Sequence, residues 1–119
     1  MINYSYWYSP DEMKYTKELD KVEEGIIASN NSIIFGPYCY LSAGDYEIEI
    51  YADGLSDDIG VEMASGETLF PVRNIDFDKE GLSFVTTINE NSSNSEVRLF
   101  TSQNNILFKG MSIRASGGM

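Results

Sequence analysis

One segment of the chain, residues 46–52 with the sequence YEIEIYA, alternates apolar and polar side chains with a period of two. Successive side chains of a β-strand point to opposite faces, so this alternation is typical of a strand that buries one face only. Tyr46, Ile48 and Ile50 are therefore expected in the core. Glu47, Glu49 and the neighbouring Tyr51 are expected on the opposite face.

Short apolar runs of this kind continue from Gly25 to the end of the chain, at roughly ten-residue spacing. Turn-forming residues separate them, as at 29–31 and 89–95. Pro71 has no N–H to give to a strand ladder, so its strand is expected at a sheet edge or at a bulge. About eight or nine such strands without a long helix predict an all-β fold, an antiparallel two-sheet sandwich of jelly-roll type.

The first 24 residues have a different composition from the rest. Residues 4–8, YSYWY, precede Pro10 and are expected to form a short strand or arm. Residues 11–24 carry six acids and three lysines, and their apolar residues fill only part of one helix face. We therefore expect either a short helix or an exposed loop there. With 119 residues and 42% apolar content, one core is expected. We predict an N-terminal arm at 1–24 that packs on a β-sandwich domain at 25–116.

The charge of the chain restricts its partners. Eight basic and nineteen acidic residues give a formal net charge of −11, which repels phosphates and anionic lipid headgroups. Neither nucleic acid nor a membrane is expected as a partner. The charge serves either solubility or binding to a basic protein partner. No apolar run of about 18 residues and no signal-peptide pattern occurs at the N-terminus, so a cytoplasmic location is expected.

The order of segments resembles the galactose-binding-like jelly-roll family. The resemblance rests on the run SIIFGPYCYLSAGDYEIEIYADG at 32–54, followed by TLFPVRNIDF, a strand pair containing EVRLF and a closing GMSIR. The resemblance covers residues 25 to 114. Within this family, the chain is similar to small carbohydrate-binding-like modules attached to bacterial glycosyltransferases. The resemblance implies a sandwich fold, with Gly36 and Pro37 at a turn, and implies a carbohydrate or glycan as the ligand.

The absence of histidine restricts the chemistry. It removes the commonest general base, the usual serine and cysteine triads and imidazole metal sites. No CxxC, P-loop or GxGxxG string occurs. We therefore predict that the protein is not an enzyme and has no cofactor. The alternative is a carboxylate pair for glycoside hydrolysis, which nineteen acidic residues could supply. Aspartates cluster at 53–58 and 76–78, but their spacing matches no defined calcium loop, so no metal is predicted.

The face opposite the core supplies the candidate binding residues. A sugar site needs an aromatic plane for the apolar ring face and planar charged groups for paired hydrogen bonds. Strand alternation predicts that residues 47–51 and 96–100 offer both on one face, and Trp7 in the arm is a further aromatic candidate. The predicted carbohydrate-binding residues are Glu47, Glu49, Tyr51, Arg73, Arg98 and Trp7. Alternatively, Glu47 or Glu49 only forms an ion pair with Arg98, and the arm's aromatics only pack.

Three functions follow from these observations. The first is a non-catalytic carbohydrate-binding-like module, alone or accessory to a glycan-processing enzyme. The second is an acidic protein-interaction module such as an adaptor, immunity factor or inhibitor, and the third is a small glycan-active enzyme with a carboxylate pair. If the first holds, Arg98 is expected to contribute most to affinity, because Val97 and Leu99 anchor its strand in the core.

Overall fold

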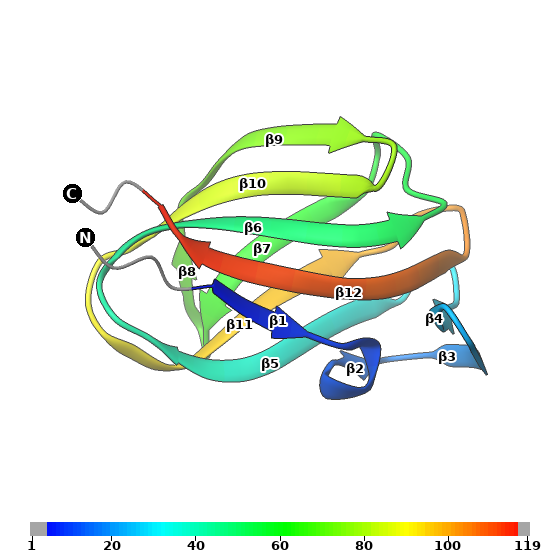
Figure 1. The fold of residues 1–119 in the computed structure, drawn as a ribbon, viewed down its shortest axis with the longest axis horizontal. Coiled ribbons are helices and arrows are strands. Elements are labelled where there is room, and N and C mark those ends of the chain that lie inside the picture. Colours follow the sequence, from blue (N-terminus) through cyan, green and yellow to red (C-terminus); the bar gives the residue numbers. More distant parts are fainter. Residues whose placement is uncertain (1–4, 117–119) are drawn as a thin grey trace.

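The computed structural model describes residues 5–116, which form two antiparallel β-sheets packed face to face (Figure 1). The seven-stranded sheet contains, in spatial order, β3 (Glu18–Val22), β4 (Gly25–Ala28), β12 (Ile106–Ala115), β6 (Gly44–Asp53), β10 (Gly81–Ile88) and β9 (Val72–Asp78), with β1 (Ser5–Tyr8) also paired to β12. The five-stranded sheet contains β2 (Lys14–Tyr15), β5 (Ile33–Leu41), β11 (Ser92–Phe100), β7 (Gly60–Ser65) and β8 (Thr68–Phe70). The predicted all-β, two-sheet antiparallel sandwich is confirmed.

The core lies between the two sheets and is built by period-two alternation. Ile48 and Ile50 of β6 are buried, as predicted, and so is Phe84 of the neighbouring β10. Val97 and Leu99 of β11 fill the core from the other sheet. Burial of each large apolar side chain is worth about 1.5–3 kcal/mol, so this interdigitated layer holds the sheets together. The polar residues between these positions are thereby directed outward.

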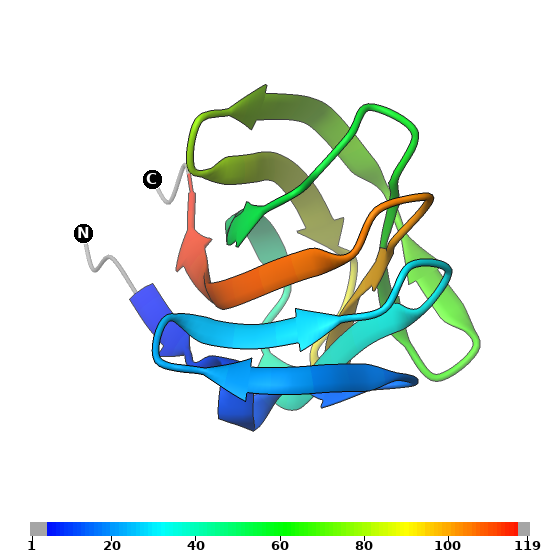
Figure 2. The same ribbon diagram turned by 90° about the vertical axis from the view of Figure 1, so that its right-hand side faces the viewer.

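The N-terminal segment forms strands at the sheet edges. A 3-10 turn at Pro10–Glu12 separates β1 from β2, and β3 pairs with β4 in a hairpin at the end of the sandwich that faces the viewer in Figure 2. The expectation of a helix or an exposed loop at 11–24 is therefore wrong. A short helix with so few apolar residues on one side would bury little surface, whereas the sheet edges provide backbone partners for β2 and β3. Tyr4 lies outside the described residues.

Pro71 lies where the chain passes from one sheet to the other. It connects β8, the edge of the five-stranded sheet, with β9, the edge of the seven-stranded sheet. The pairing of β9 with β10 also contains a bulge. The predicted edge position of Pro71 is confirmed. Within residues 5–116, no helix has the length and apolar character needed to cross a membrane.

Two isoleucine substitutions test the assignment of the core. Ile48→Val removes a methylene from a side chain that is 0% exposed and should lower the free energy of unfolding by about 0.5–1.5 kcal/mol. Ile75→Val makes the same change at a side chain that is 50% exposed on β9, and should change stability by less than about 0.5 kcal/mol. Urea unfolding measures both. Equal losses would contradict the orientation assigned to β6.

Candidate functional site

The six sequence-predicted site residues lie on two opposite faces of the sandwich. Trp7, Glu47, Glu49, Tyr51 and Arg73 belong to the seven-stranded sheet, on its outer face, whereas Arg98 lies on β11 of the five-stranded sheet. The prediction that Arg98 and Tyr51 share one face is therefore wrong. Alternation along a strand fixes which residues point outward, but it carries no information about which sheet the strand joins.

The outer face of the seven-stranded sheet has an aromatic centre. We call the surface formed by Trp7, Glu47, Glu49, Tyr51 and Arg114 the Trp7 face. The benzene ring of Trp7 occupies the space into which a side chain at Gly110 would project. The Trp7 and Tyr51 ring centroids are 5.6 Å apart at an interplanar angle of 51°, and Trp7 remains 54% exposed. The indole is therefore both fixed by packing and open to solvent.

Charged groups surround these two rings. The Tyr51 hydroxyl donates to Glu49 Oε2 at 3.1 Å, while Arg114 forms an ion pair with Glu47. Burial, followed by the hydrogen bond to the anionic Glu49, raises the pKa of Tyr51 above its ordinary value. The alternative that Glu47 or Glu49 pairs with Arg98 is wrong, because Arg98 lies on the other sheet and Glu47 pairs with Arg114 of β12 instead.

Arg73 lies at the far end of the same sheet face. Its guanidinium donates to Thr87 Oγ1 at 2.8 Å and lies 3.7 Å from Asp45 Oδ1. Asp45 precedes Tyr51 by six residues on β6, which corresponds to about 20 Å along a strand. Arg73 is therefore separate from the aromatic centre of the Trp7 face.

A groove of about 300 Å³ lies on the outer face of the five-stranded sheet. We call it the Arg98 groove; its lining residues are Thr16, Ile33, Phe35, Tyr38, Glu96 and Arg98. The strand register explains this set, because Arg98 of β11 lies directly opposite Phe35 of β5. The groove thus combines apolar and aromatic walls with a guanidinium and a carboxylate.

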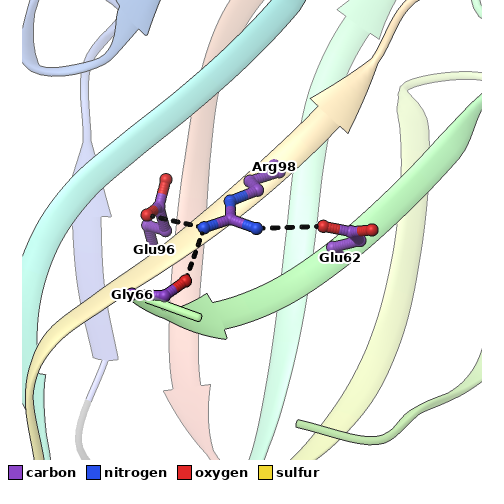
Figure 3. Close-up of polar contacts among 4 residues, drawn as sticks. All are labelled: Glu62, Gly66, Glu96 and Arg98. Carbon is purple, nitrogen blue, oxygen red and sulfur yellow. Dashed lines mark hydrogen bonds and ion pairs between the residues drawn. The ribbon is translucent and has the colours of Figure 1, made fainter. Parts of the chain in front are cut away.

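Arg98 is held by three acceptors (Figure 3). Nη1 donates to Glu62 Oε1 at 3.2 Å, and Nη2 donates to the Gly66 carbonyl at 2.8 Å and to Glu96 Oε2 at 3.3 Å. Hydrogen bonding to Glu96, with a further contribution from Glu62, raises the pKa of Arg98 above its ordinary value, against an opposing effect of burial. Glu96 itself is only 5% exposed, so this ion pair is a rigid part of the sheet.

The aromatic wall of the Arg98 groove has an unusual backbone. Tyr38 has a φ of +67° and is 42% exposed, and its ring meets Phe35 edge to face with centroids 6.4 Å apart. Positive φ is disfavoured for a bulky side chain, at about 1–3 kcal/mol. Such strain often accompanies a functional position, and here it places a large aromatic ring at the mouth of a groove.

The sequence-based prediction missed several residues of these surfaces, among them Phe35, Tyr38 and Arg114. Phe35 and Tyr38 flank the Gly36–Pro37 step, where the family resemblance implies a turn. That expectation is wrong, because both residues of that step lie within β5 and pair with β11. Arg114 lies in the last strand, and its contact with Glu47 depends on the register of β12 against β6. The tyrosine next to a Gly–Pro step is the one local signal that could have drawn attention to the groove.

No protein-family model, curated protein or solved structure matches the chain. The aspartates of the loops are engaged locally: Lys109 contacts Asp53 at 2.9 Å, and Ser102 donates to Asp58 at 2.6 Å. Within the part of the chain that the structure describes, no group of three or more His, Cys, Asp or Glu side chains is placed to hold a metal ion.

Gly110→Ala tests the packing of the Trp7 face. The added methyl group would overlap the benzene ring of Trp7, so the indole should be displaced from Tyr51. Trp7 is the only tryptophan of the chain, so its fluorescence spectrum reports the displacement directly. Gly66→Ala is the control, because it also has a positive φ but has open space around the new methyl group. A spectrum of Gly110→Ala identical to that of the unmodified protein would contradict this packing.

Proposed function

We propose that the protein is a non-catalytic carbohydrate-binding module, alone or accessory to a glycan-processing enzyme, and that the sugar binds in the Arg98 groove. One observation carries the proposal: the groove places an aromatic pair beside a rigid guanidinium–carboxylate pair. Ligand sites are typically concave, mostly apolar and supplied with a few fixed polar groups. The groove has each of these properties.

The aromatic part of the groove suits the apolar face of a sugar ring. Phe35 and Tyr38 meet edge to face, so the partly exposed Tyr38 ring is supported from the side. A supported ring loses little conformational freedom when a ligand stacks on it. The C–H groups of one sugar face would thus replace water against Tyr38.

The polar part of the groove suits sugar hydroxyl groups. A guanidinium has five N–H donors, and the three bonds to Glu62, Gly66 and Glu96 leave two of them without an acceptor among residues 5–116. These two donors, on Nε and Nη1, lie on different edges of the guanidinium, so each can donate to a separate sugar hydroxyl. One guanidinium set against two carboxylates leaves a local charge of −1, which favours a neutral over an anionic sugar.

The same contacts favour binding over catalysis. Glycoside hydrolysis needs two carboxyl groups flanking the bond, one of them protonated to act as an acid. Glu62 and Glu96 are instead both acceptors for the Arg98 guanidinium, so neither is placed to flank a glycosidic bond. The groove therefore lacks an evident acid, and a binding role explains its residues better.

Arg98→Ala tests the proposal after a glycan array has identified a neutral ligand. Loss of charge-assisted hydrogen bonds worth about 1.5–3 kcal/mol should weaken binding about tenfold or more. Because Arg98→Ala leaves Glu96 unpaired and destabilises the protein, Arg98→Lys is measured alongside; it keeps the charge but lacks the planar fork. Arg114→Ala is the matched control, since it breaks an ion pair on the other sheet. Unchanged affinity of the two Arg98 variants, both folded, would contradict the proposal.

Tyr38→Asn separates binding from stability. Asparagine tolerates positive φ, so relief of backbone strain should offset the lost contact with Phe35, and thermal stability should change by less than about 1 kcal/mol. Affinity for the sugar should nevertheless fall about tenfold, because the stacking surface is gone. Thermal melts and calorimetric titration measure the two effects. A large loss of stability with unchanged affinity would mean that Tyr38 serves the fold alone.

A further inference from the structure

We propose that the Trp7 face is a second binding site, which takes the arginine or lysine side chain of an extended, basic segment of a protein partner. The site lies on the outer face of the seven-stranded sheet, whereas the Arg98 groove lies on the other sheet. The two sites are therefore independent, and neither proposal rests on the other.

The aromatic centre of the Trp7 face suits a cation. A cation within about 6 Å of a ring centroid is attracted by the ring quadrupole, and tryptophan is the strongest aromatic partner. Trp7 is held in place by Gly110 and Tyr51 yet remains more than half exposed. A preformed and accessible indole of this kind can receive a side chain without rearrangement.

The charges around the rings favour the same ligand. Glu49 lies beside Tyr51 and accepts its hydroxyl hydrogen, and Glu47 lies two residues along the same strand. Arg114 neutralises only Glu47, so Glu49 contributes an uncompensated negative charge at the edge of the aromatic pair. The formal net charge of −11 adds a long-range attraction for a basic partner.

The strand that carries Trp7 explains why the cation should come from an extended polypeptide. Within residues 5–116, β12 is the only strand that pairs with β1, so β1 has a free edge (Figure 1). Tyr6, the neighbour of Trp7 on β1, lines a cavity of about 250 Å³ together with Tyr40, Leu41, Ser42 and Tyr46. Adjacent side chains of an added strand point to opposite faces. One residue could therefore cover Trp7 while its neighbour fills the tyrosine-lined cavity.

A short blocked peptide, acetyl-Gly-Ser-Arg-Leu-Ser-Gly-amide, tests the proposal with the full-length protein. Its arginine is expected on Trp7 and its leucine in the cavity, so the fluorescence of the single tryptophan should change and saturate. Replacing arginine with uncharged citrulline should weaken binding about fivefold or more, the factor that a cation–π contact of about 1 kcal/mol implies. Equal binding of the two peptides, or no fluorescence change with the arginine peptide, would overturn the proposal.

Matched variants show whether binding is local. Glu49→Gln should weaken binding of the arginine peptide severalfold. Glu67→Gln removes the same charge from an exposed turn of the other sheet and should have little effect on that binding. Trp7→Leu keeps apolar area but removes the π surface, and calorimetry should show at least a fivefold loss of affinity for the arginine peptide. Tyr38→Asn in the Arg98 groove should leave peptide affinity unchanged. Equal effects of Glu49→Gln and Glu67→Gln would indicate unspecific attraction by net charge and overturn the site.

Discussion

The pairing of β12 with β6 is the constraint on which the outer surface of the seven-stranded sheet depends. β12 pairs with β6 along most of its length, and on its other side it pairs with β4 and with β1. Its inward side chains Phe108, Met111 and Ile113 are essentially inaccessible to solvent, which fixes its orientation. A slip of one residue would turn these side chains outward, so the core itself enforces the register that brings Trp7 to Tyr51.

The same constraint explains how far the sequence could predict the structure. The period-two pattern of residues 46–52 was sufficient to place Ile48 and Ile50 inside and Glu49 outside, because it is a local property of one strand. Sheet membership was not predictable in this way, because it depends on contacts between distant segments. Arg98 and Arg114 both follow an inward-facing residue of a strand, and only the register shows that Arg114 reaches Glu47. β1 was expected from the aromatic run at 4–8, whereas β2 and β3 depend on free sheet edges that no local pattern reveals.

The two proposed sites have the same kinds of side chain but differ in how the carboxylate is paired. Each places an exposed aromatic ring next to a carboxylate on a rigid strand. In the Arg98 groove the carboxylate is paired with an arginine, so the surface offers hydrogen-bond donors and suits neutral hydroxyl groups. On the Trp7 face Glu49 is not neutralised by Arg114, so the surface suits a cation. Because the sandwich separates them, a glycan and a protein partner could be held at the same time.

Chemical-shift mapping with a neutral oligosaccharide tests the central claim, which is that the sugar binds to the five-stranded sheet. The account predicts that amide signals of β5 and β11 around Phe35, Tyr38 and Arg98 move on titration, while the indole N–H signal of Trp7 stays in place. Shifts centred on Trp7 and Tyr51, with the β11 amides unchanged, would contradict the account and move the sugar to the seven-stranded sheet.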